Sequence, residues 1–180
     1  MLKDYRKTRE ADLQAEAPSE HWLNWNLRYH TTYQKIIGDK FSSPILDLGC
    51  GTDDFSKALR QIGYQAEGID VDRVDFEKDP LPYADETFGV VHFNAVLEHI
   101  KNPDHVMREI GRILRPNGIV IINTPNWQQD FKNFHNDPTH VKPHTPKSLE
   151  MLLKMYSFKV LFLEPALICK SHLHWKLPDL

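Results

Sequence analysis

The sequence has few cysteines and no long apolar segment. Its two cysteines, Cys50 and Cys169, exclude the disulfide framework of a small secreted domain and suit a reducing compartment. No stretch approaches the roughly 18 consecutive apolar residues of a transmembrane helix, and the start of the chain, Met1 to Lys7, lacks the apolar core of a signal peptide. We therefore expect a cytoplasmic protein without a membrane partner.

Charge of one sign is also scarce. The 22 Lys and Arg against 25 Asp and Glu give a net charge of −3 without a long basic block, so nucleic acid is not an expected partner. The 180 residues, of which 41% are hydrophobic, are enough for one globular domain with a sizeable core. Oligomeric state cannot be read from the sequence, and a homodimer stays open.

The most informative stretch begins at about residue 44. Apolar residues at 44–49 predict a short buried strand, Gly49 and Gly51 a tight turn, and the amphipathic run from Asp54 to Ile62 a helix. Glycines allow a ligand to approach the backbone, and a helix start presents N–H groups. This arrangement is typical of nucleotide-binding folds.

A second predicted strand, Gln65 to Ile69, ends at Asp70, nineteen positions after Gly51. An acidic residue at about this distance holds a ribose diol in nucleotide-binding folds. Only ten residues separate Asp70 from Leu81, too few for a helix and a full strand, so we expect a compact connection with a very short strand near Val74.

The rest of the chain alternates strands with helices, which favours a mostly parallel sheet. Helices are predicted at 19–37, 102–114 and 146–155, and strands at 88–94, 119–123, 159–163 and 166–170. Residues 1–19 read as a helical or frayed lead-in.

Several motifs together resemble those of the class I S-adenosylmethionine (SAM)-dependent methyltransferases, of the small-molecule type with a Leu-Glu-His motif. The first is Asp47-Leu-Gly-Cys-Gly-Thr, and the others follow in the family's order over roughly residues 40 to 165. These are Asp70, Asp75, Leu81-Pro-Tyr-Ala-Asp-Glu-Thr-Phe88, Val96-Leu-Glu-His-Ile100 and Arg112-Ile-Leu-Arg-Pro-Asn-Gly118.

The resemblance implies a Rossmann-like α/β fold with a mostly parallel, seven-stranded sheet, shortened here after strand two. It also implies an N-terminal helical extension or lid, residues 1–40, before a SAM-binding domain, residues 41–180, within one globular whole. The expected cofactor is SAM, and the residues expected to bind it are Asp47, Gly49, Cys50, Gly51, Asp70, Val71, Asp75, Phe76 and Asn94.

Three carboxylates have separate expected roles. By resemblance, Asp47 holds the amino group of SAM, Asp70 the two ribose hydroxyls, and Asp75 the adenine amine, for which Asp72 and Asp79 compete. Asp47 could equally be a strand-end cap of the glycine turn, and Asp70 a solvated loop acid.

Two positions depart from the family's pattern. Asp53 stands where a third glycine is usual, and it could cap the following helix or crowd the SAM carboxylate. Gly89 stands where an acid is common. Both motivate an alternative function, a non-catalytic SAM-binding or regulatory protein on a methyltransferase-like fold.

The segment from Thr124 to Thr145 should overhang the methyl-transfer side, because it follows a strand of the sheet. Histidine suits removal of a proton from an acceptor hydroxyl. His140 is the first candidate base, His135 and His144 are alternates, and all could instead bond to loop carbonyls. For the Glu98-His99 pair, a structural role at a helix start is favoured over catalysis.

A metal site built from nitrogen and oxygen ligands in this loop is conceivable, but no metal is expected. The residues that would form it are His135, Asp137, His140 and His144.

The sequence therefore predicts methyl transfer from SAM to a small-molecule acceptor, with oxygen the favoured acceptor atom. A dinucleotide-dependent oxidoreductase is disfavoured, because the glycine pattern reads Gly-x-Gly-x-Asp and 180 residues leave no room for a second catalytic domain. The identity of the acceptor stays open.

Overall fold

A computed structural model describes residues 19–165 of the chain. Its sheet contains four parallel strands in the order β2-β1-β3-β4. The strands are β1 (Ile45–Leu48), β2 (Ala66–Ile69), β3 (Phe88–Asn94) and β4 (Leu114–Asn123). The α-helices are α2 (Ser19–Ile37), α3 (Asp54–Gln61), α4 (Asp104–Ile113), α5 (Trp127–Asp130) and α6 (Pro146–Met155), and the 3₁₀ turns are η1 (Gly38–Lys40), η2 (Leu97–His99) and η3 (Phe134–Asn136). Among these residues, no helix combines the length and apolarity needed to cross a bilayer.

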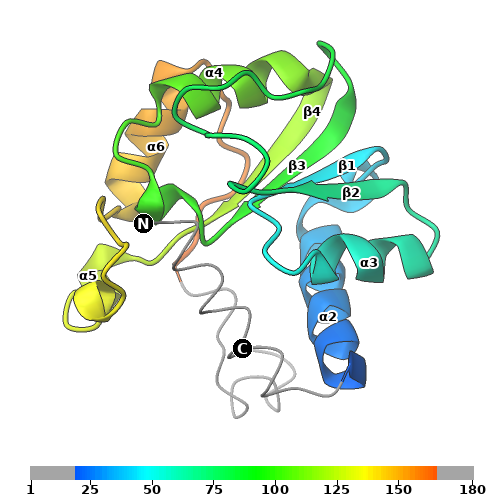
Figure 1. The fold of residues 1–180 in the computed structure, drawn as a ribbon, viewed down its shortest axis with the longest axis horizontal. Helices are drawn as coiled ribbons and strands as arrows, with labels where there is room; N and C mark the ends of the chain where they lie inside the picture. The colour runs from blue at the N-terminus through cyan, green and yellow to red at the C-terminus, as the bar shows by residue number, and fades with distance from the viewer. Residues whose placement is uncertain (1–18, 166–180) are drawn as a thin grey trace.

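Helices cover both faces of the sheet (Figure 1), with α2 and α3 on one side and α4 and α6 on the other. Alternate residues of β1 take opposite sides: Ile45 packs with the aromatic residues of α2 and α3, whereas Leu46 and Leu48 pack with the apolar side of α4. All four residues of β1 are buried, which is why this strand reads as a nearly continuous apolar run.

The order of the strands reverses at β1. The chain passes from β1 through α3 to β2, then crosses to β3 on the other side of β1. In open α/β sheets the crevice beyond the carboxyl ends of the strands at such a reversal is where ligands bind. Here it lies between the turn after β1 and Asn94 at the end of β3.

The predicted α/β class, the parallel sheet and the elements at 19–37, 54–62, 88–94 and 146–155 are confirmed. The strand count differs, because residues 19–165 contain four strands and not seven. The connection near Val74 forms turns that bury this side chain without strand pairing, and residues 159–163 form no strand. The strand predicted at 166–170 and the lead-in at 1–18 lie outside the described residues, and the lid boundary at residue 40 stays a prediction.

The strand predicted at Ile119 begins earlier, at Leu114. Phe88 pairs with Leu114 and Val90 with Ile119, so the sheet absorbs the predicted Pro-Asn-Gly turn as a shift of register. Pairing on both sides of the irregularity makes this one strand.

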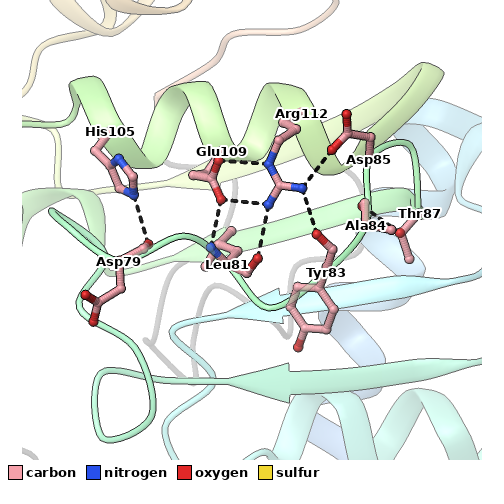
Figure 2. Close-up of polar contacts among 9 residues, drawn as sticks. All are labelled: Asp79, Leu81, Tyr83, Ala84, Asp85, Thr87, His105, Glu109 and Arg112. Carbon is pink, nitrogen blue, oxygen red and sulfur yellow. Dashed lines mark hydrogen bonds and ion pairs between the residues drawn. The ribbon is translucent and has the colours of Figure 1, made fainter.

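The side chain of Arg112 holds the compact connection between β2 and β3 against α4 (Figure 2). It makes a two-pronged pair with Glu109, at 2.8 Å from Nε and 2.7 Å from Nη2. The same guanidinium donates to the carbonyls of Tyr83 at 2.7 Å and Leu81 at 3.0 Å and to the Asp85 carboxylate at 2.9 Å. Five contacts match the five N–H donors of arginine, and the carboxylates of Glu109 and then Asp85 raise its pKa.

We predict that Arg112→Lys destabilises the fold although it keeps the charge, because one ammonium cannot replace five donors in a plane. The expected loss of unfolding free energy is about 1–3 kcal/mol. Urea denaturation of Arg112→Lys beside Arg108→Lys measures it. Arg108 pairs with Asp104 on the exposed side of the same helix, so the control should lose less than about 1 kcal/mol. Equal losses would mean that the contacts of Arg112 are no more than an ordinary surface ion pair.

Candidate cofactor and acceptor site

The turn after β1 contains two glycines with different local constraints. Gly49 has a φ of +82°, and its N–H donates to the Ile69 carbonyl at 2.8 Å. A Cβ at this position would collide with the side chain of Val96, so packing alone requires glycine. Gly51 has a φ of +55°, but a Cβ there would meet no atom of the chain within 4 Å. The space beside the Cα of Gly49 is therefore filled by the chain itself, whereas the space beside the Cα of Gly51 is open to a ligand.

Asp70 closes this turn from the neighbouring strand. Its carboxylate accepts the N–H of Gly51 at 2.6 Å and the N–H of Val71 at 2.6 Å, and the residue is only 8% exposed. Each carboxylate oxygen can accept more than one hydrogen bond. The open position at Gly51 beside an oriented carboxylate fits the expected nucleoside of SAM, whose ribose presents two hydroxyl donors.

Asp53 does not cap helix α3, contrary to one sequence-based expectation. It has a φ of +63° and makes no capping hydrogen bond. Its carboxylate instead pairs with Arg60 at 2.8 Å, and its Oδ1 is buried without a hydrogen-bond partner among the described residues. A Cβ on Gly68 would collide with this oxygen. The carboxylate that replaces the usual glycine is thus accommodated by Gly68 on β2, which leaves space for it, and by Arg60 on α3, which pairs with it.

Asp47 belongs to a series of hydrogen-bonded, largely buried polar side chains on the α2 and α3 side of the sheet. Its Oδ1 lies 2.7 Å from Nδ1 of His92, whose Nε2 lies 3.0 Å from the Tyr33 hydroxyl. Asn123 donates to that hydroxyl at 2.6 Å. Because the Asp47 carboxylate can only accept, His92 donates to it from Nδ1 and accepts the Tyr33 hydroxyl at Nε2. Burial raises the pKa of Tyr33. The series joins β1, β3, β4 and α2.

The residues expected around adenine take other contacts. Asp75 is exposed; it accepts the N–H of Glu77 and pairs with Lys78 at 3.1 Å. Phe76 is 2% exposed and packs in the core beside α4. The competing Asp79 accepts the N–H of Asp75 at 2.9 Å. These contacts build the compact connection itself.

A cavity of about 780 Å³ lies along β4, a size suited to a small organic molecule. Residues at the carboxyl ends of β3 and β4, α2 and the loop after β4 contribute to its lining. Its polar lining includes Tyr33, Asn94, Asn123, Thr124 and His144. Asn94 is therefore a member of both the expected cofactor site and this cavity.

The three candidate bases have different surroundings. His144 lines the cavity and is 4% exposed, and its Nε2 has no hydrogen-bond partner among the described residues. Burial, with a smaller effect of Lys142, lowers the pKa of His144 to about 4. His135 is exposed, whereas His140 donates from Nδ1 to the Phe134 carbonyl at 2.7 Å and lies beside Glu98. The structure thus separates the three histidines.

The sequence analysis did not assign Tyr33, His92 or Asn123 to the site. His92 carried the one available signal, because it is a polar residue inside the apolar run of β3. Tyr33 contacts His92 from 59 residues away, and Asn123 contacts Tyr33 from 90 residues away, so both contacts arise only through the fold.

Comparison with known proteins places the chain among related sequences. Residues 21–162 match the family described as "Methyltransferase domain". The chain is 25% identical over 153 residues to a probable S-adenosylmethionine-dependent methyltransferase of Mycolicibacterium smegmatis, covering 76% of this chain and 60% of that protein. It is 28% identical over 141 residues to a ubiquinone biosynthesis O-methyltransferase of Photobacterium profundum, covering 64% of this chain and 57% of that protein. The chain thus spans less than two thirds of the length of either relative.

Solved structures share the fold. The crystal structure of a SAM-dependent methyltransferase from Archaeoglobus fulgidus matches with a TM-score of 0.60 and 21% identity, covering 79% of this chain and 70% of that chain.

The low pKa of His144 predicts a pH dependence of stability. Its folded pKa of about 4 lies below its ordinary value of 6.5, so the unfolded chain binds more protons between these values and stability falls as pH falls through that window. His144→Gln should reduce the loss of unfolding free energy between pH 7.5 and pH 5 by up to about 2 kcal/mol. Denaturation at both pH values measures this, with His105→Gln as the control. An unchanged loss in His144→Gln would show that this ring titrates normally.

Proposed function

The chain belongs to the class I S-adenosylmethionine-dependent methyltransferase family, and from this premise we propose that it binds SAM and methylates an oxygen atom of a small molecule. The observation that carries the proposal is the turn at Gly51. The space beside its Cα is open to a ligand, and its N–H donates to the Asp70 carboxylate at 2.6 Å. Bound SAM supplies a methyl group on a positively charged sulfur, which is already a good leaving group.

We assign the binding of SAM to the carboxyl ends of β1, β2 and β3. Asp70 would accept the ribose hydroxyls, since a carboxylate can accept paired donors, and the backbone at Gly49, Cys50, Gly51 and Val71 would approach the ligand. Asp47 would hold the amino group, and its contact with His92 at 2.7 Å fixes its direction.

At the sulfur of the ligand, Asn94 would make the contact. We also propose that Asp75 and Phe76 contact adenine, through the exposed carboxylate of Asp75 and the backbone of this turn.

Oxygen is the proposed acceptor atom for two reasons. One of the relatives is a ubiquinone biosynthesis O-methyltransferase, and the cavity beside Asn94 contains a neutral histidine. As the oxygen forms its bond to the methyl group and the carbon–sulfur bond breaks, the hydroxyl proton has to leave. We assign that proton to Nε2 of His144, because this buried nitrogen has no hydrogen-bond partner among the described residues.

We predict that Gly51→Ala weakens SAM binding by about 10-fold or more, because the new Cβ enters space that the chain leaves open. Gly38→Ala is the matched control. Gly38 has a φ of +57° and equally open surroundings, but it follows α2 outside the site. Both variants should lose about 1 kcal/mol of stability, since alanine disfavours positive φ.

Isothermal titration calorimetry with SAM and with S-adenosylhomocysteine measures these affinities. The wild type and Gly38→Ala should bind both compounds alike. A wild type that binds neither compound would defeat the proposed function, and equal affinities of the two variants would remove Gly51 from the site.

We predict that His144→Gln lowers methyl transfer to a phenolic or catecholic acceptor about 100-fold, within the range expected for loss of a general base. SAM affinity should stay unchanged, because His144 contacts the acceptor side. Release of S-adenosylhomocysteine from a panel of such acceptors gives the rate, and His105→Gln on α4 serves as the control. A loss of activity in His140→Gln together with an active His144→Gln would assign the base to His140.

A further inference from the structure

Three metal-ligating side chains that are far apart in the sequence meet beside the carboxyl ends of β3 and β4. Glu98 and His99 come from η2, and His140 comes from the loop after η3. One ligand atom of each lies within 4.8 Å of the others. Glu98 is 1% exposed, and its Oε1 lies 4.0 Å from Nε2 of His140. This cluster is separate from the proposed base, His144.

We propose that Glu98, His99 and His140 bind one divalent transition-metal ion, with Zn²⁺ as the reference ion. Two imidazoles and one carboxylate are a ligand set that suits zinc, iron, cobalt or nickel, whereas magnesium and calcium prefer oxygen ligands. The proposal does not depend on methyl transfer, because it concerns a second ligand of the chain.

Hydrogen bonds to the other ring nitrogens set the tautomers that such a site needs. His140 donates from Nδ1 to the Phe134 carbonyl at 2.7 Å. Nδ1 of His99 lies 3.2 Å from the Thr139 carbonyl and 2.9 Å from its hydroxyl. Each ring therefore directs Nε2 to the cluster. A backbone carbonyl on the opposite nitrogen is the usual support of a metal-bound histidine.

The carboxylate and the loop are held in place by further contacts. The Thr124 hydroxyl donates to Oε2 of Glu98 at 3.0 Å. The N–H groups of Val141 and Lys142 donate to the backbone carbonyl of Glu98 at 2.9 and 3.1 Å. These bonds fasten the loop that contains His140 to η2, so the ligands are brought together before any ion binds.

The spacing of the groups around His140 also suits a metal ion. Asp137 adds a carboxylate whose Oδ2 lies 3.9 Å from Nε2 of His140. Zinc–nitrogen bonds of about 2.0 Å require ligand atoms about 3.3 Å apart, so the side chains would close by roughly 1 Å around the ion.

This site differs from the one considered in the sequence analysis, and it replaces the expectation that no metal binds. Of the four residues considered there, His135 is exposed and His144 lines the cavity along β4. His140 is shared by both sets. Glu98 and His99 were expected to have a structural role at a helix start, and His140 lies 41 residues after His99.

Titration of the full, untagged chain, first stripped of metal with a chelator, tests the proposal. Calorimetry with Zn²⁺ should show one saturable site, and Co²⁺ should give visible absorption bands of a low-coordinate ion. Glu98→Gln and His140→Gln should each weaken Zn²⁺ binding about 100-fold or more, since each removes a ligand. His135→Gln should bind Zn²⁺ as the wild type does.

Two further measurements keep the outcome unambiguous. Circular dichroism of each variant shows whether it is folded, and a His172→Gln/His174→Gln variant accounts for the histidines near the end of the sequence. No saturable Zn²⁺ binding by the wild type would overturn the proposal, as would a loss in the His172/His174 or His135 variants as large as that in His140→Gln. Because SAM titration reports on the other site, its failure and the failure of metal binding are distinguishable.

Discussion

The Asp70 carboxylate, bound to the N–H groups of Gly51 and Val71, is the interaction on which the proposed cofactor site depends. It joins the end of β2 to the turn after β1, so two neighbouring strand ends become one surface. Both bonds are short and involve a charged acceptor, which makes them stronger than neutral hydrogen bonds. The positive φ of Gly51 turns its N–H toward this carboxylate while leaving the space beside its Cα open.

A second group of hydrogen-bonded polar side chains begins at β1 and extends away from β2, across β3 and β4. The hydrogen bonds from Asp47 through His92 and Tyr33 to Asn123 cross three strands and reach α2, and of these four side chains only Asn123 is half-buried while the others are buried. Buried polar groups specify a unique arrangement only when each has a partner. These hydrogen bonds therefore connect a proposed cofactor contact, Asp47, with two residues of the cavity, Tyr33 and Asn123.

The sequence allowed some of these features to be predicted, since they are local. The run Phe88–Asn94 has the apolar character of a strand buried on both faces, and the spacing from Gly51 to Asp70 reflects one strand–helix–strand unit. Asp53 could not be understood from its neighbours in sequence, because the space for its carboxylate comes from Gly68 on another strand.

The grouping of Glu98 and His99 with His140 could not be predicted from the sequence either, because it also depends on contacts between distant segments. It depends on backbone bonds between η2 and a loop that has no regular pattern. Seven strands were expected from the family resemblance, and the short connection at Val74 has too few residues to form one of them.

The proposed site unites a glycine turn, a carboxylate and a cavity at the strand-order reversal, and its most direct test is structural. A crystal structure of the chain with S-adenosylhomocysteine should show the Asp70 carboxylate within hydrogen-bonding distance of both ribose hydroxyls and the ligand sulfur facing the cavity beside Asn94. A nucleoside bound elsewhere, without contact to the Asp70 carboxylate, would contradict the account.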